Sequence, residues 1–158
     1  MAFAYLKEIT EAAEKENKPF WQIVIEDDMR ERNVSYEQSF ETMRGMYQAM
    51  KEADAAYDPK LRSASGMVGG DGEKLEEFHK KKNRLIGDFL TEVMEKAVKM
   101  GESNACMKRI VAAPTAGSCG VIPAVLLTYE MQKNVSEDKL VEALFVAAGI
   151  GEVIAASA

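Results

Sequence analysis

Residues that bind metal ions are scarce in this 158-residue sequence, which has two cysteines, Cys106 and Cys119, and one histidine, His79. A structural zinc ion needs about four cysteine or histidine ligands, and an iron–sulfur cluster is normally held by several cysteine thiolates. We therefore expect no zinc site and no complete cluster site within these residues. Two cysteines in a reducing compartment are also expected to be free thiols.

The sequence also lacks an excess of basic over acidic residues, and it lacks long apolar runs. Lysine and arginine total 20 against 26 aspartates and glutamates, a net charge of −6. Such a chain has no basic surface for phosphate backbones, so we predict no nucleic-acid partner. The one basic run, HKKKNR at residues 79–84, is typical of a solvated face or turn. No apolar stretch approaches the ~20 residues that cross a bilayer, and the acidic N-terminus lacks a signal-peptide pattern, which predicts a cytoplasmic protein with no membrane partner.

Alternating apolar and polar residues, which would indicate strands, are also missing. Apolar residues instead recur at helical spacing, which predicts an all-α, irregular multi-helix fold in a single domain, residues 1–158. The first three expected helices cover residues 3–16, residues 19–32 and the segment from Ser35 to Asp58. A fourth runs from Asp71 or Gly72 towards His79, a fifth covers residues 85–100, and a short helical turn follows in SNACMKR. The last two cover residues 123–132 and the segment that begins at Asn134 or Ser136.

Local sequence marks several helix ends. Pro19 suits a first helical position, Ser35 with Gln38 forms a capping box, and Gly101 is expected to close the helix over residues 85–100. The expected core stripes are Phe40, Met43, Tyr47, Met50 and Ala53; Ile86, Leu90, Val93, Ala97 and Met100; and Leu140, Val141, Leu144, Phe145 and Ala148. The last segment, FVAAGIGEVIAASA, stays apolar to its final residue, so we expect a domain truncated at its C-terminus.

Two glycine-dense loops interrupt the helices, RSASGMVGGDGEK at residues 62–74 and IVAAPTAGSCGVIPAV at residues 110–125. Neither has the spacing of a P-loop or of a dinucleotide-binding fingerprint, and Ser118 is not in a nucleophile elbow. Both loops lead into a helix start, where free N–H groups and the helix dipole bind anions such as a carboxylate. The alternative is that the glycines are ordinary caps and tight helix crossings, and the spacing leaves both interpretations open.

Four residues near the loops and the basic run need separate interpretation. Cys119 lies near a helix start, where the pKa of a thiol can fall, but the only histidine is far upstream, so we do not expect a catalytic cysteine. We expect His79, beside three lysines, at the surface. Asp71 could face the ammonium group of a ligand or cap the helix that begins there, and Asn104 could bond a ligand carboxylate or cap its turn.

Together the two loops resemble a known family. SASGMVGGDGEKL at residues 63–75 and ESNACMKRIVAAPTAGSCGVIPAVL at residues 102–126 are similar to the α chain of the iron–sulfur-dependent L-serine dehydratases. The family pattern is a Ser/Thr-x-Ser/Thr-Gly-hydrophobic-Thr-Gly-Gly-Asp loop, then Asn-Ala-x-Met-Gly, then an Ala-Pro-Thr-Ala/Asn-Gly segment ending in Ile/Val-Pro. Val68 stands where threonine is frequent, and Lys108 stands where glycine is frequent.

This resemblance implies the conversion of L-serine to pyruvate and ammonia without pyridoxal phosphate. The α-proton is removed, hydroxide leaves, and the resulting enamine becomes an imine that hydrolyses. A [4Fe–4S] cluster would act as Lewis acid on the serine hydroxyl. The family's cluster cysteines lie downstream, so we expect this chain to be the N-terminal part of an α chain, without cluster ligands and inactive alone. A β chain or a fused regulatory domain, and an oligomer, are also implied.

The resemblance further implies that residues 63–72 and 114–120 hold the carboxylate and ammonium groups of serine. The substrate-binding residues that it indicates are Ser63, Ser65, Gly66, Gly69, Gly70, Asp71, Asn104, Thr115, Ala116 and Gly117. The sequence points to no particular catalytic base and to no preference between serine and threonine. The alternative, from another class of protein, is a non-catalytic helical module that binds a small carboxylate ligand or a partner chain.

Overall fold

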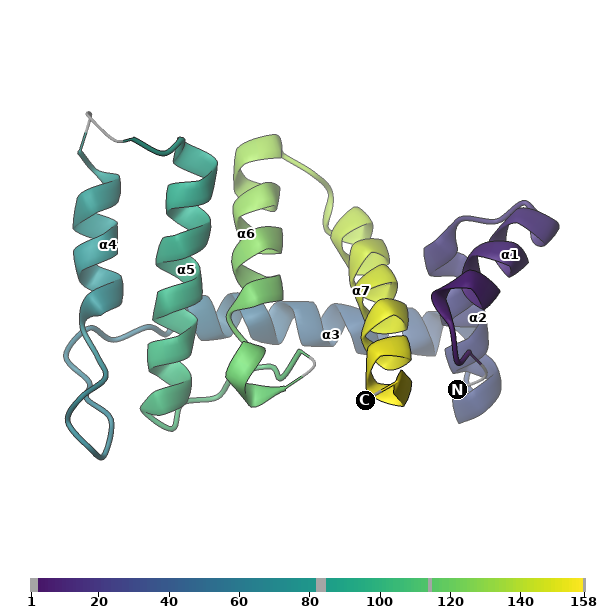
Figure 1. The fold of residues 1–158 in the computed structure, drawn as a ribbon, viewed down its shortest axis with the longest axis horizontal. Coiled ribbons are helices and arrows are strands. Elements are labelled where there is room, and N and C mark those ends of the chain that lie inside the picture. The colour runs from purple at the N-terminus through teal and green to yellow at the C-terminus, as the bar shows by residue number, and fades with distance from the viewer. Residues whose placement is uncertain (1–2, 82–84, 114, 158) are drawn as a thin grey trace. The chain divides into compact units, whose positions relative to one another are not determined.

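The computed structural model describes residues 3–81, 85–113 and 115–157. These residues form seven α-helices and one short 3-10 helix and contain no strand, which confirms the predicted all-α fold (Figure 1). The elements are α1 (Leu6–Glu16), α2 (Phe20–Arg32), α3 (Tyr36–Ala55), α4 (Asp71–His79), α5 (Asp88–Ala105), η1 (Ala116–Ser118), α6 (Val121–Lys133) and α7 (Glu137–Ser157). None of the described helices is long and apolar enough to cross a bilayer.

Several helix ends follow from local sequence. Asn17, Asn33 and Asn134 end α1, α2 and α6 in the left-handed conformation, with φ of 53°, 53° and 50°, which asparagine tolerates better than most residues. The predicted capping box before α3 is confirmed: the Gln38 N–H donates to Ser35 Oγ at 3.2 Å, and the Ser35 N–H donates to Gln38 Oε1 at 2.9 Å.

Contacts divide the chain into two compact units, and the first comprises Met1–Met46 and Ser136–Ala158. Within it, α2 packs against both α1 and α7. Four residues of the predicted α7 stripe are confirmed as core, since Leu140, Val141, Leu144 and Phe145 are buried, whereas Ala148 is half-buried. Gly149 allows α7 to approach α2 closely, because a Cβ atom there would lie 2.6 Å from Val24 Cγ2.

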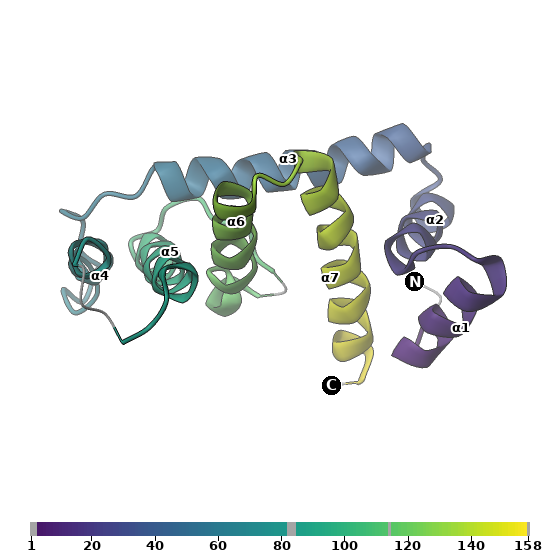
Figure 2. The ribbon, with the colours of Figure 1, turned by 90° about the horizontal axis from the view of Figure 1, so that it is seen from above.

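The second unit is Tyr47–Val135, which begins midway along α3 and includes α4, α5, η1 and α6. Helices α4, α5 and α6 lie side by side in it, with the last part of α3 across one face of α5 and α6 (Figures 1 and 2). Tyr47, Met50 and Ala53 of α3 are buried, as their spacing predicted. Polar contacts reinforce this packing: Tyr47 donates to Glu130 of α6 at 2.9 Å, and Lys96 of α5 binds Asp54 at 2.7 Å.

Helix α5 departs most from the prediction. Gly101 does not end it: the helix continues through the expected short turn to Ala105, and the chain leaves it at Met107, whose φ is 61°. The expected apolar stripe is also wrong as a core, since Leu90 is 50% exposed and only Met100 of that set is buried. The helix instead buries a polar face that includes Thr91, Glu92, Glu95, Glu102 and Ser103. Neighbouring elements supply hydrogen-bonding partners for the three glutamates of this face, whereas the Thr91 hydroxyl donates to a carbonyl one turn earlier in the chain.

Candidate functional site

In the structure the first glycine loop is residues 62–70, because residues 71–74 belong to α4, and it is a tight turn held by its own backbone. The Ser63 N–H donates to the Val68 carbonyl at 2.9 Å, and the Gly66 N–H donates to the Ser63 carbonyl at 2.8 Å. Gly66 has φ of 72°, a conformation that glycine adopts without strain. The Ser63 and Ser65 hydroxyl oxygens lie 3.1 Å apart beside this turn. The loop therefore presents hydroxyl groups on a short, ordered bend.

Gly69 and Gly70 are explained by the loop itself. Their φ angles, 137° and 82°, are in the region that favours glycine. A Cβ atom at Gly69 would lie 2.3 Å from the Leu61 carbonyl oxygen, and one at Gly70 would lie 2.9 Å from an Arg62 guanidinium nitrogen. The Arg62 side chain thus covers these glycines and donates to the Pro59 and Leu61 carbonyls. At these positions the glycines serve close packing within the loop.

The helix start that follows this loop already binds a carboxylate, that of Glu102 in α5. The Asp71 N–H donates to Glu102 Oε1 at 2.7 Å, and the Gly72 N–H donates to Glu102 Oε2 at 3.2 Å. Tyr57 donates its hydroxyl hydrogen to the same Oε2 at 2.6 Å. Burial and this contact raise the pKa of the Tyr57 phenol. The anion expected at this helix start is therefore supplied by the chain itself.

Asp71 does not cap α4. The N-cap residue is Gly70, with no side-chain cap bond, and Asp71 is the first helical residue. Its carboxylate is exposed and binds Lys74 Nζ at 2.7 Å, an interaction that holds the pKa of Asp71 below its ordinary value. The capping interpretation is wrong, because Asp71 is itself the first residue of the helix and its carboxylate binds the Lys74 side chain rather than a backbone N–H group.

In the structure the second glycine loop ends at Gly120, before α6, and hydroxyl groups hold its turn at residues 115–118. The Thr115 N–H donates to Ser118 Oγ at 3.2 Å, and the two hydroxyl oxygens of these residues are 3.0 Å apart. Asn104 of α5 donates to the Ala116 carbonyl at 2.9 Å, so its amide holds this loop. Gly117 is exposed, whereas Gly120 is buried where α6 crosses α5: a Cβ atom there would lie 2.6 Å from the Ala97 carbonyl oxygen.

The last turns of α5 connect the two loops. Glu102 binds the helix start beside the first loop, and Asn104, two residues on, binds the second loop. Both loops lie at the same end of α4, α5 and α6 (Figure 1). A cavity of about 10 Å³ beside Gly69, Glu102 and Cys106 could hold one water molecule but no amino acid.

The residues proposed from the sequence to bind substrate lie on this end of the second unit. Ser65, Gly66, Thr115, Ala116 and Gly117 are exposed, and Ser63, Gly69 and Asn104 are half-buried. Gly70 is buried, and Asp71 is exposed. Pro114, which begins the expected second binding segment, lies outside the described residues.

The cysteines differ in environment. Cys119 is 1% exposed and packs with Ala53 and Met100, with Ile110 beside them. Burial raises the pKa of its thiol, which disfavours the reactive thiolate, as expected for a residue that serves packing. Cys106 is half-buried and free. Over residues 3–81, 85–113 and 115–157, no three or more cysteine, histidine or acidic side chains form a group that could hold a metal ion.

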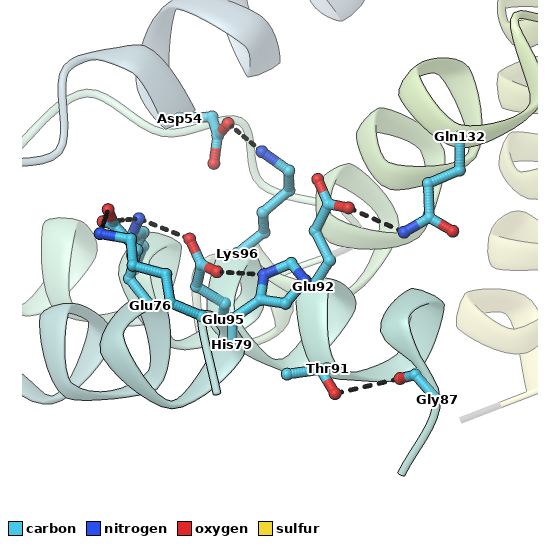
Figure 3. Close-up of polar contacts among 11 residues, drawn as sticks. Asp54, Glu76, His79, Gly87, Thr91, Glu92, Glu95, Lys96 and Gln132 are labelled. Carbon is cyan, nitrogen blue, oxygen red and sulfur yellow. Dashed lines mark hydrogen bonds and ion pairs between the residues drawn. The ribbon is translucent and has the colours of Figure 1, made fainter. Parts of the chain in front are cut away.

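A network of charged side chains between α4 and α5 is the feature that the sequence analysis missed (Figure 3). His79 Nδ1 lies 2.9 Å from Glu95 Oε2, and Lys99 binds both Glu95 at 2.7 Å and Glu76 at 2.8 Å. Nearer the start of α5, Glu92 accepts a hydrogen bond from Gln132 of α6 at 2.8 Å. The acidic residues 92, 95 and 102 recur at helical spacing, and this periodicity could have indicated a partnered polar face.

His79 is half-buried in this network rather than at the free surface, so that expectation is wrong. It ends α4, whereas the first glycine loop precedes α4. With about 1.5 Å of rise per residue, the nine residues of α4 separate the two by about 12 Å. His79 and Glu95 therefore stabilise the packing of α4 on α5 and do not face a ligand held at the loops.

Comparison with known proteins identifies relatives over nearly the whole chain. Residues 15–158 match the family described as serine dehydratase alpha chain. A probable L-serine dehydratase alpha chain of Bacillus subtilis is 30% identical over 156 residues, which cover 99% of this chain and 52% of that protein. The L-serine dehydratase alpha chain of Peptoniphilus asaccharolyticus is 27% identical over 159 residues, covering 94% of this chain and 51% of that protein.

A shorter region is more similar to longer relatives. L-serine dehydratase 2 of Escherichia coli is 43% identical over 58 residues, which cover 36% of this chain and 13% of that protein. No solved structure is significantly similar to the chain. The chain spans about half the length of the curated alpha chains that it matches, 52% and 51%.

Proposed function

Because the chain belongs to the serine dehydratase alpha chain family, we propose that it supplies the two substrate-binding loops of an L-serine ammonia-lyase. The enzyme would convert L-serine to pyruvate and ammonia. Residues that the chain does not contain would be needed for activity, since the related alpha chains are about twice as long. Those relatives are named alpha chains, which supports a β chain, or a fused domain, as partner in an oligomer.

The observation that supports this proposal is that the two family-like loops lie at one end of the second unit, on either side of α5 (Figure 1). Had they been at opposite ends of the helices, they could not share a small ligand. Ser65 and Thr115 expose hydroxyl groups there, and Ser63 adds a half-buried one. These hydroxyl groups can donate to a substrate carboxylate, while the exposed Gly66 and Gly117 leave space for it to approach the backbone.

The iron–sulfur cofactor expected from the family does not fit the residues described here. A [4Fe–4S] cluster needs thiolate ligands, whereas Cys119 is enclosed with Ala53 and Met100 and its thiol pKa is raised. Cys106 alone does not make a ligand set. We propose that, if the complete enzyme binds such a cluster, the ligands come from a part of the protein other than these residues.

Complementation tests the proposed function. Residues 1–158 should be co-expressed with the remaining segment of a related alpha chain and, where required, its β chain, under anaerobic conditions. Serine-dependent pyruvate and ammonia formation is the expected result. A completed protein that binds a small carboxylate or a partner chain tightly but never forms pyruvate would contradict the proposal and favour a non-catalytic module.

Substitutions in the completed enzyme test the individual hydroxyl groups. Ser65→Ala and Thr115→Ala should each lower kcat/KM for serine by about 10- to 100-fold, because a hydrogen bond to a charged group is worth about 1.5–3 kcal/mol. Thr10→Ala, which removes an exposed hydroxyl from α1, is the matched control and should leave kcat/KM unchanged. Steady-state kinetics with serine gives the comparison, and wild-type values for either variant would remove that residue from the site.

A further inference from the structure

Glu102 lies where a carboxylate is expected to be unfavourable unless something compensates it. It is 5% exposed and lies in the last turn of α5. The C-terminal end of a helix carries partial negative charge, so α5 itself opposes an anion there. A buried carboxylate also loses its hydration and must recover hydrogen bonds from the protein. The compensation has to come from outside α5.

Three donors outside α5 supply that compensation. The N–H groups of Asp71 and Gly72 bind the two carboxylate oxygens separately, and Tyr57 donates to one of them. The positive end of the α4 dipole points at the same carboxylate. This arrangement satisfies both oxygens and fixes the start of α4, immediately after the first glycine loop, against the end of α5.

The same end of α5 holds the second loop by a separate contact, from Asn104 to the Ala116 carbonyl. Glu102 and Asn104 belong to one rigid helix, so the separation of their attachment points is set by α5. We propose that Glu102 is a positioning residue, whose carboxylate clamps the first glycine loop at a fixed distance from the second. This inference rests on the proposed function for its catalytic consequence, but the clamp itself can be tested without it.

The clamp has a consequence for ligand recognition. The Asp71 and Gly72 N–H groups are engaged by Glu102, so they do not bind the carboxylate of a substrate. A carboxylate ligand would instead use the exposed hydroxyl groups of Ser65 and Thr115 and the backbone of the loop turns. Glu102 thus acts through the loop that it fixes, without contacting the ligand.

Hydrogen exchange on residues 1–158 tests the clamp directly. Glu102→Gln replaces one acceptor oxygen with an N–H₂ donor, which faces an N–H group that it cannot bind. Exchange at Asp71 and Gly72 should accelerate by about 10- to 100-fold, the loss expected for a hydrogen bond to a charged group. Glu92→Gln is the matched control: it changes another buried glutamate of α5, whose partner is Gln132, and should leave exchange at both residues unchanged.

Unchanged exchange at Asp71 and Gly72 in folded Glu102→Gln would overturn the clamp. If that variant does not fold, Tyr57→Phe serves instead, because it removes one donor and keeps the carboxylate. Exchange at the two residues should then rise by a smaller factor, and wild-type exchange would again overturn the proposal.

Kinetics of the completed enzyme test the positioning role. Glu102→Gln should raise KM for serine about tenfold with a smaller change in kcat, since a loosened loop must be ordered again at each binding event. A purely structural role would lower the active fraction, and so apparent kcat, with KM unchanged; that outcome would contradict positioning. If the completed wild-type enzyme has no serine dehydratase activity, the proposed function fails, while the exchange measurement still decides whether Glu102 is a clamp.

Discussion

Glycine has two different uses among the residues of the second unit, and the surroundings of each residue decide which applies. Gly69 and Gly70 have positive φ angles and lie under Arg62, so they are needed by the loop conformation. Gly120 has an ordinary helical conformation but no space for a side chain, since Ala97 of α5 lies against it. Gly101 has neither requirement, as no atom beyond its chain neighbours and its own helix backbone lies within 4 Å of the position that a Cβ would take.

This difference predicts opposite effects of alanine at two glycines. Gly120→Ala should destabilise the protein by about 1–3 kcal/mol, because the added methyl group would force α6 away from the α5 backbone. Gly101→Ala should stabilise it by about 0.5–1 kcal/mol, because alanine loses less entropy than glycine in a helix interior. Urea unfolding followed by circular dichroism measures both, and a neutral Gly120→Ala would contradict the close crossing of α5 and α6.

At the scale of elements, α4 and α5 are joined by ion pairs rather than by apolar side chains alone. Glu76 binds Lys99 at 2.8 Å and Lys80 at 2.9 Å, and these lysines lower the pKa of Glu76 to about 2. A group whose pKa is lower in the folded state stabilises the protein above its ordinary pKa. That contribution is lost as pH falls from about 4.5 to about 2.

Glu76→Gln should therefore be less stable than the wild type at pH 7 and equally stable near pH 2. The Glu76 side chain is 41% exposed, so solvent screening limits the difference to about 1 kcal/mol or less. Urea unfolding at pH 7, 4.5 and 3 measures the difference between the two proteins. Glu77→Gln, at the exposed next residue, is the control, and a Glu76→Gln difference that does not shrink on acidification would show that the lysine contacts are not its cause.

At the scale of the whole molecule, acidic residues affect pH-dependent stability in both directions. In the first unit, burial raises the pKa of Glu152 in α7, and the negative charges of Glu31, Asp27 and Asp28 raise it further. A group whose pKa is raised on folding stabilises the protein below its ordinary pKa. That stabilisation is lost as pH rises through the folded pKa, so Glu152 and Glu76 have opposite effects.

Glu152→Gln is expected to raise the thermal stability at pH 7, because the amide keeps the size of the side chain without the charge. This gain in thermal stability should disappear when the pH falls below 4.5, the ordinary pKa of a glutamate, because the wild-type carboxyl then becomes protonated. Melting curves at pH 7 and pH 4 provide the comparison. A lower melting temperature of the variant at pH 7 would mean that the Glu152 carboxylate has a stabilising partner.

The sequence by itself determined the local structure of this protein. Helical periodicity and end residues, such as the Ser35–Gln38 box, depend on neighbours within about one helical turn. The α7 stripe could be predicted in the same way, because Leu140, Val141 and Leu144 are apolar residues at helical spacing and all three are buried. The family-like loops, and with them the candidate ligand site, were recognisable because their residue types are adjacent in the chain.

Only the tertiary structure decided what lies against those loops and inside α5. Glu102 and its partner Asp71 are 31 positions apart in the sequence, and Glu92 and its partner Gln132 are 40 positions apart. A glutamate is expected at the surface unless paired, so the buried face of α5 could not be inferred without knowing its partners. The physical reason is that a charge can be buried only where distant segments bring donors to it, and chain folding alone sets that proximity.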